Sequence, residues 1–350
     1  MKEFIGIGEI LHYTHLIWGF FYCVCCLLFV MCLTAILFGE DLAKYGFGRS
    51  HPWNNERIYD FWSKFQQMGL DKVPEILIEE PELALEESIL SFHDKDYVEL
   101  VKKAGKIGNG YLDTGDTPAF RGAFEASSYV VGSTLKAFDI VIRKTNGIKH
   151  AFNPIGGLHH SKRTTAAGFC IFNDIGIAIL EARRKHGIKK IAYVDIDAHH
   201  GDGVYYEFED DPLLYIADIH EDGKFLYPGT GSEWETGIGD AAGTKLNIPL
   251  NPNSTDQDFI ASFKRVEDFI DTKAKPELII LQCGADSLKY DPLTHLNLTH
   301  NSHKYAASKL HSLAHKHSNG RIVALGGGGY NKINIGDAWT AVVKAFIENL

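Results

Sequence analysis

Runs of residues that are apolar at almost every position recur between residues 33 and 325 and alternate with segments of helical periodicity. KIAYVDI at 190–196 and ELIILQC at 277–283 are typical of these runs. A strand is apolar on both of its faces where helices cover both sides of a parallel sheet. The chain is therefore expected to form an α/β fold with a mostly parallel sheet. The other expected strands are 33–38, 149–155, 213–219 and 321–325, and the expected helices are 56–68, 85–104, 119–144, 174–186, 256–271, 302–318 and 334–349.

The composition is compatible with one large folded unit. Of the 350 residues, 45% are hydrophobic and 23% are charged, which supplies enough apolar material for a large core. No internal repeat, low-complexity stretch or linker interrupts residues 40–350, so this part is interpreted as one domain. The net charge is -10 and no run rich in Lys and Arg occurs, so direct binding of nucleic acid is not expected.

The six cysteines do not form the pattern of a disulfide framework. Four of them, at 23, 25, 26 and 32, share one apolar run, and the other two, at 170 and 283, stand alone in apolar segments. A thiolate zinc site is also not indicated, because no CxxC pair is matched by a second one. This usage is typical of a reducing compartment, and we expect a cytoplasmic catalytic domain.

The N-terminal segment allows two interpretations. From residue 16 to residue 39 no side chain is charged, and the run exceeds the roughly 20 apolar residues that span a bilayer. Residues 1–31 would then be a transmembrane anchor ahead of a catalytic domain at 32–350. Alternatively, residues 33–38 form the first strand, which leaves only about 15 to 18 residues for a helix. In that interpretation Met31 is the true start and the preceding residues are an extension.

Four polar clusters follow the carboxyl ends of expected strands. GGLHHS follows the strand at 149–155, DIDAHHGDG closes the strand at 190–196, GAD follows 277–283, and GGGGY follows 321–325. Ligand sites in open parallel sheets lie in the crevice at the carboxyl ends of the strands. We therefore expect these four segments to meet at one edge of the sheet.

The second cluster has the composition of a metal site. Asp195, Asp197 and His199 are spaced two residues apart and share one face of an extended chain. Asp286 is placed to supply the third ligand of an ion that Asp197 and His199 also bind. Two carboxylates and one imidazole leave a position for water, as catalytic zinc requires. The same oxygen-rich set also suits Fe(II) or Mn(II).

Adjacent histidines in the first cluster suit proton transfer. His159 and His160 are too close in sequence for both to be good metal ligands on one strand face. They suit acid–base chemistry beside an activated water instead. Each needs an orienting acceptor, and Asp195 and Asp202 are the candidates.

Three aromatic residues have either a functional or a packing interpretation. Tyr330 follows four glycines, a loop that lets the backbone approach a site closely, and its hydroxyl could donate to a developing oxyanion. Phe169 and Tyr227 stand on loops near the same edge and could wall a channel. The alternative for all three is packing in the core or against the sheet.

The motifs GGLHHS, GFCIFND, DIDAHHGDG, YPGTG, CGADS and GGGGYN occur in the order and context of the histone deacetylase family, and the chain resembles its class I and acetoin-utilization-type members. HPWNNERI at 51–58 and SFHDKDYVELV at 91–101 resemble that family as well. The resemblance covers about residues 36–350. It implies the arginase–deacetylase fold, a three-layer α/β/α sandwich with a mostly parallel eight-stranded sheet.

The resemblance implies a zinc-dependent deacetylase that hydrolyses N-acetyl-lysine to lysine and acetate with a metal-activated water. Zinc would be held by Asp197, His199 and Asp286, with Fe(II) as the alternative ion. His160 would act as general base and acid, with Asp202 behind it. A structural potassium ion near the loop after residue 195 is also implied. The partner would be an acetylated protein, or alternatively an acetylpolyamine or another small acetylated amine.

The resemblance assigns the other site residues too. His159, paired to Asp195, is an electrostatic partner of the base, and Tyr330 polarises the acetyl carbonyl. Tyr227 stands where Phe is common in the family. This difference bears on which substrate chain the enzyme prefers and not on the chemistry of the reaction. The implied substrate-binding residues are Asp116 for the substrate backbone, Gly168, Phe169, Tyr227 and Leu298 for the acetyl-lysine tunnel, and Arg57 for an internal acetate channel.

Two other functional classes fit the sequence less well. An arginase-like hydrolase with two manganese ions would need further carboxylates beside Asp286, but Ser287 and Leu288 follow it. A catalytically inactive acetyl-lysine reader would be expected to lack some of the catalytic residues, and here all of those positions are filled.

Overall fold

Parallel strands form the centre of the fold, as the apolar runs predict. The computed structural model describes residues 33–348, and within them one eight-stranded sheet has the order β2-β1-β3-β8-β7-β4-β5-β6. Every neighbouring pair in this sheet is parallel. The strands are β1 Leu33–Leu37, β2 Ile76–Glu79, β3 Ile148–Asn153, β4 Ile191–Asp195, β5 Leu214–Glu221, β6 Lys245–Leu250, β7 Leu278–Gln282 and β8 Ile322–Leu325.

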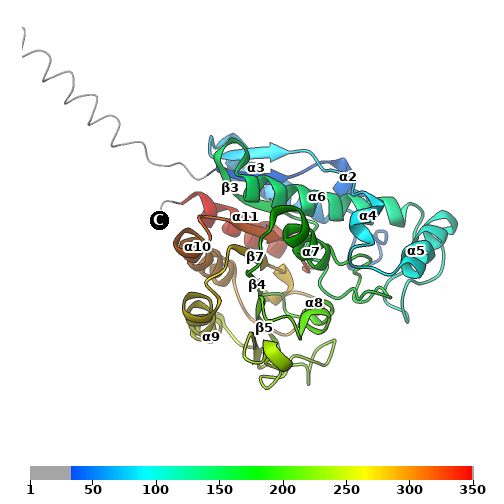
Figure 1. Ribbon diagram of the computed structural model, residues 1–350. Helices are drawn as coiled ribbons and strands as arrows, with labels where there is room; N and C mark the ends of the chain where they lie inside the picture. Colours follow the sequence, from blue (N-terminus) through cyan, green and yellow to red (C-terminus); the bar gives the residue numbers. More distant parts are fainter. Residues whose placement is uncertain (1–32, 349–350) are drawn as a thin grey trace, which may run out of the picture. The chain divides into compact units, whose positions relative to one another are not determined.

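Helices cover both faces of this sheet, because side chains of each strand point alternately to the two sides. In β7, Leu278 and Ile280 join one core cluster, while Ile279 and Leu281 join the other. The first cluster is closed by α5, α6 and α7, and the second by α3, α9, α10 and α11 (Figure 1). The expected three-layer α/β/α sandwich is confirmed. The helices are α2 Glu40–Ala43, α3 Arg57–Gln67, α4 Glu86–Ile89, α5 Lys95–Ile107, α6 Ala123–Arg143, α7 Asp174–His186, α8 Asp202–Tyr205, α9 Asp256–Asp268, α10 His300–His317 and α11 Lys332–Ile347.

Two edge strands are absent from the sequence prediction. β2 and β6 lie at the two ends of the sheet, and neither is apolar throughout. β6 contains Lys245 and Pro249, residues that disfavour a strand assignment from sequence. An edge strand needs less apolar surface than a central one, so a search for fully apolar runs overlooks it.

The single helix expected at 85–104 is wrong, because the structure has two helices there. Asp94 has extended backbone angles, and its amide donates to the carbonyl of Arg163, so α5 begins anew after α4 has ended. The helix expected at 256–271 starts as predicted in α9 and continues from Phe269 to Ala274 as a wider π-helical turn.

The predicted N-terminal extension or anchor at 1–31 lies outside the described residues, so both interpretations of it stay predictions. Among residues 33–348, no helix combines the length and the apolar character that crossing a membrane requires. The described cysteines, Cys170 and Cys283, are buried free thiols, as expected of small apolar core residues.

Candidate active site

Neighbouring strands bring the predicted metal ligands together. β4 ends at Asp195, and the loop that follows it carries Asp197 and His199. Asp286 lies in the short 3-10 turn after β7. Because β4 pairs with β7, and Asp195 lies opposite Gln282, the residues that follow both strands meet at one edge of the sheet.

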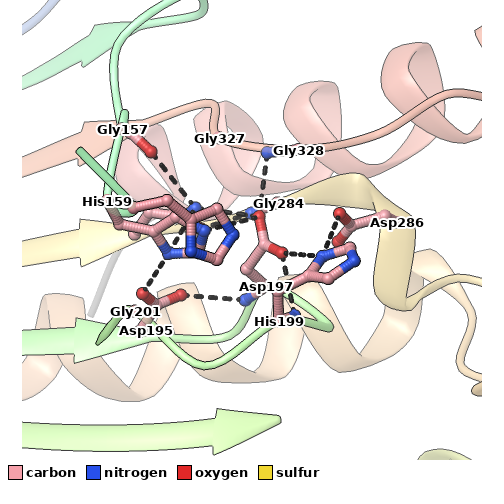
Figure 2. A network of polar contacts seen from close by, with 12 residues as sticks. Gly157, His159, Asp195, Asp197, His199, Gly201, Gly284, Asp286, Gly327 and Gly328 are labelled. Atoms are coloured by element: carbon pink, nitrogen blue, oxygen red, sulfur yellow. Dashed lines mark hydrogen bonds and ion pairs between the residues drawn. The ribbon is translucent and has the colours of Figure 1, made fainter. Parts of the chain in front are cut away.

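The three ligand candidates lie within contact distance of one another. His199 Nδ1 is 3.0 Å from Asp197 Oδ1 and 3.1 Å from Asp286 Oδ2 (Figure 2). Each residue offers one ligand atom, and these atoms lie within 4.8 Å of one another. A Cβ on Gly328 would lie 2.1 Å from Asp286 Oδ2, so only glycine leaves room beside the carboxylates. The donor set and the space therefore fit a divalent ion such as zinc.

The electrostatics of these residues favour a positive charge at this point. Burial opposes the charged form of His199, but its hydrogen bonds to Asp197 and Asp286 outweigh burial and raise its pKa to about 10. Burial also opposes ionisation of Asp197, yet His159 and His199 hold the pKa of Asp197 well below its usual value. A proton on His199 or a divalent ion can supply the positive charge that the carboxylates require.

Further groups hold the ligands in place. Gln282 Nε2 and the Gly328 amide each donate to Asp197 Oδ2 over 2.8 Å, and the Ala198 amide donates to Asp286 Oδ1 over 3.0 Å. Sequence reasoning missed Gln282. Its sequence position does point to a role, because Gln282 is the polar last residue of an otherwise apolar strand and directly precedes the predicted site.

Each of the adjacent histidines has its own carboxylate. His159 Nδ1 lies 2.8 Å from Asp195 Oδ2, and His160 Nδ1 lies 2.7 Å from Asp202 Oδ1. Burial opposes the charge on His159, but Asp195 and Asp197 raise its pKa to about 9. Burial and the neighbouring His159 lower the pKa of His160 to about 4, although Asp202 opposes this shift. The pair therefore combines a charged and a neutral imidazole at neutral pH.

A cavity lies over this group of residues. Tyr330 belongs to its lining, and the Tyr330 amide donates to Asp291 Oδ2 over 2.8 Å, which fixes the loop that carries the tyrosine. Asp291 is a second residue that sequence reasoning missed. The residues that line the cavity are Trp53, Gly157, His159, His160, Gly168, Cys170, Asp197, His199, Gly328 and Tyr330.

Gly168 and Phe169 approach the histidine pair closely. Both have positive φ, 52° and 66°, and a Cβ on Gly168 would lie 2.3 Å from His160 Cδ2. The Phe169 amide donates to Thr117 Oγ1 and its carbonyl accepts from the Tyr45 hydroxyl, which holds this backbone in place. The Phe169 ring packs edge-on against Tyr330 at 5.9 Å between centroids.

Two further predicted residues lie near the cavity from different elements. The ring of Tyr227 lies 5.1 Å from that of His160, and Tyr227 is 44% exposed. Arg57 in α3 is buried, and its Nε and Nη2 donate to the carbonyls of Gly329 and Gly327. Its guanidinium also stacks over Trp53 at 3.9 Å from the ring centroid. Arg57 therefore holds the glycine loop in place through these two hydrogen bonds.

The predicted substrate anchor Asp116 is partly buried next to this region. Asp116 Oδ1 accepts from the Thr117 hydroxyl over 2.8 Å, and that hydroxyl accepts from the Phe169 amide. Burial and a hydrogen bond with Asp113 raise the pKa of Asp116 to about 6. Asp116 is thus tied through Thr117 to the loop that lines the cavity.

Leu298, the last of the predicted substrate-binding residues, packs in the core. It is 1% exposed, packs in the core cluster under α9 and α10, and forms a parallel bridge with Leu288. It is not among the residues that line the cavity. Its predicted place in a tunnel wall stays a prediction, like that of Phe169 and Tyr227, which are also not among the residues that line the cavity.

The sequence and the structure place this chain in a known family. The family of the histone deacetylase domain matches residues 51–346, and the chain belongs to it. The acetoin utilization protein AcuC of Bacillus subtilis (strain 168) is 38% identical over 320 residues, which cover 89% of this chain and 80% of that protein. AcuC of Staphylococcus xylosus is 33% identical over 326 residues, covering 90% of this chain and 82% of that protein.

A solved structure agrees with this assignment. The crystal structure of the HDA15 HD domain superposes with a TM-score of 0.82 at 26% identity, and the match covers 90% of each chain. The eight-stranded parallel sheet is thus the arginase–deacetylase fold, and the enzyme class to which the family belongs is the deacetylases.

Proposed function

We propose that this protein is a zinc-dependent deacetylase that hydrolyses the amide of N-acetyl-lysine to lysine and acetate. The observation that carries this proposal is the cavity in which Asp197, His199, His160 and Tyr330 meet. It combines a set of metal ligands, a neutral base and a hydroxyl donor around one small space. A structural potassium ion near the loop after Asp195 stays a prediction from the family resemblance.

A divalent ion held by Asp197, His199 and Asp286 would supply Lewis-acid chemistry, lowering the pKa of a coordinated water and polarising the acetyl carbonyl. Zinc is proposed because two carboxylates and one imidazole leave room for a water at a tetrahedral ion. The same ligands accept Fe(II), so the ion used in the cell is part of the test.

His160 is the proposed general base. The Asp202 carboxylate accepts a hydrogen bond at Nδ1 of His160, so the proton of the neutral ring sits there and the lone pair is on Nε2. Nε2 takes one proton from the attacking water and later delivers it to the leaving amine. His159, held by Asp195, contributes a positive charge beside it.

Tyr330 is the proposed oxyanion donor. Its ring is held between Phe169 and Trp53, and its backbone is held by Asp291. A hydroxyl fixed in this way can stabilise the charge that develops on the acetyl oxygen without reorganising.

A second candidate function is the deacetylation of acetylpolyamines. The acidic pair Asp113 and Asp116 favours it, because their negative charge would attract a cationic amine chain. Both candidates use the same catalytic residues and differ only in the group that lies outside the cavity.

The test compares an acetyl-lysine peptide with N-acetylputrescine, each with and without a hydroxamate chelator. The protein is stripped of metal and reloaded with zinc, Fe(II) or Mn(II). We expect hydroxamate-sensitive release of acetate, with a higher kcat/KM for the peptide. A kcat/KM that favours the acetylpolyamine would replace the first candidate by the second. The absence of turnover on both substrates with every ion would refute the proposal.

A further inference from the structure

A second group of metal-binding side chains lies away from the active site. His150 in β3 and His311 and His315 in α10 each offer a ring nitrogen, and these atoms lie within 4.8 Å of one another. His311 and His315 are four residues apart on the same face of the helix. We propose that these three histidines bind a divalent transition-metal ion, with zinc as the expected ion.

This site lies at the amino ends of the strands. His150 is the third residue of β3 and pairs with Ile322, the first residue of β8. The catalytic segments, in contrast, follow the carboxyl ends of β3 and β8. The histidine cluster therefore lies toward the opposite ends of the strands from the deacetylase cavity, and its three residues are not among those that line the cavity.

The contact between His150 and His315 has the spacing of two ligands of one ion. Their Nε2 atoms lie 3.4 Å apart, which is longer than a usual hydrogen bond. Two nitrogens at about 2.0–2.1 Å from a tetrahedral zinc ion lie about 3.3–3.4 Å from each other. The two rings therefore already have the separation that a shared ion requires.

His311 has a nitrogen available for the same ion. Its Nε2 is buried and has no hydrogen-bond partner among the described residues. The backbone of Ala345 forms a hydrogen bond with the same imidazole and helps to orient it. With the proton on Nδ1, Nε2 would offer the lone pair that a metal-ligating histidine needs.

The surroundings keep all three rings in the neutral form that binds metals. Burial and the other two histidines lower the pKa of His150 well below its usual value. Burial and His315 lower the pKa of His311 to about 4, and burial and Lys149 lower that of His315. The positive charge of Lys149 disfavours binding of a metal ion nearby. However, the three imidazoles are already neutral at neutral pH and need not lose a proton to bind it.

The remaining contacts suit a site that ties the sheet to the helix layer. Thr34 Oγ1 in β1 lies 3.3 Å from His150 Nδ1 and orients that ring. The ring of Phe346 lies 5.5 Å from His150 and 6.2 Å from His311, which shields the buried side. His315 is partly exposed, so an ion can enter from solvent beside it. A metal here would link β3 to α10.

The test measures metal stoichiometry in the full chain after stripping and reloading with zinc. The wild type is expected to bind about two ions per chain, and His315→Gln about one, with deacetylase turnover kept. His317→Gln is the matched control, because His317 lies on the same helix and pairs with Asp271 instead. The same number of ions in the wild type and in His315→Gln would overturn the inference.

Two further variants separate this site from folding effects and from the catalytic site. In His315→Cys a thiolate replaces one imidazole, so cobalt binding should persist and the sulfur charge-transfer absorbance should rise above that of the wild type. Unchanged cobalt content without that rise in absorbance would count against the site. Asp286→Ala removes a ligand of the catalytic site only. If Asp286→Ala/His315→Gln binds about one ion fewer than Asp286→Ala, the ion that is lost belongs to the histidine cluster.

Discussion

The Nδ1 atom of His160 lies 2.7 Å from Oδ1 of Asp202, although 41 residues separate the two in the chain. His159, the adjacent residue, pairs with Asp195 instead. Two neighbouring imidazoles are thus oriented by two different carboxylates, and they differ in charge at neutral pH. This division is what allows one ring to accept a proton while the other provides a positive charge.

Asp202→Asn is expected to lower kcat by about 10–10²-fold, because a neutral amide attracts the Nδ1 proton less strongly and its NH2 group can donate to Nδ1, which favours the other tautomer. Acetate release from an acetyl-lysine peptide measures this effect. Asp240→Asn is the matched control, because Asp240 is exposed and far from the pair in sequence. Equal turnover in Asp202→Asn and Asp240→Asn would contradict the role of Asp202.

Tyr330→Phe is expected to lower kcat by about 10²–10³-fold with a small change in KM, because it removes an oxyanion donor and keeps the ring. Steady-state kinetics on the peptide substrate give both values. Tyr290→Phe is the control, since Tyr290 is 78% exposed. Near-normal turnover in Tyr330→Phe would refute the oxyanion role.

Gln282→Ala is expected to weaken zinc binding by about 10–100-fold, because Asp197 Oδ2 loses one of its two donors. Competition with a chromophoric chelator measures the affinity. Gln66→Ala, at an exposed position of α3, should bind zinc like the wild type. If both variants had the same affinity, Gln282 would not support the metal ligands.

Gly328→Ala is expected to abolish zinc binding at the catalytic site. The backbone of Gly328 is not in the left-handed region, so alanine can adopt the same backbone angles. Its Cβ, however, would lie 2.1 Å from Asp286 Oδ2 and 2.8 Å from Asp197 Oδ2. Metal analysis measures the loss, and circular dichroism verifies that the chain is folded. A folded variant that retains the ion would show that the loop can move away.

Asp116→Asn is expected to stabilise the protein at pH 7 while weakening peptide binding by about 10-fold or more. The folded protein raises the pKa of Asp116 to about 6 from its usual 3.8, so it binds this proton more tightly than the unfolded chain does. The contribution of Asp116 to stability therefore falls as pH rises between about 4 and 6. Thermal unfolding from pH 4 to 8 should show an advantage for the variant that disappears at low pH. A constant difference across this range would argue against that titration.

The helices and strands of the fold were predictable where the sequence has one clear pattern, such as an unbroken apolar run. The apolar runs at 190–196 and 277–283 became the central strands β4 and β7, and α7 has the predicted bounds 174–186. The edge strands β2 and β6 were not predictable in this way. Each has a neighbouring strand on one side only, and its sequence mixes polar and apolar residues. The break between α4 and α5 depends on a contact with Arg163, which is distant in sequence.

The sequence by itself determined the chemistry of the site: which side chains follow each strand, and that Asp197, His199 and Asp286 can share an ion. Only the tertiary structure decided the distances between them, the role of Gln282, and the packing of Leu298 in the core. It also brought His150 next to His315, 165 residues away. The physical reason is that residue types follow local spacing, whereas a contact depends on how strands and helices pack together.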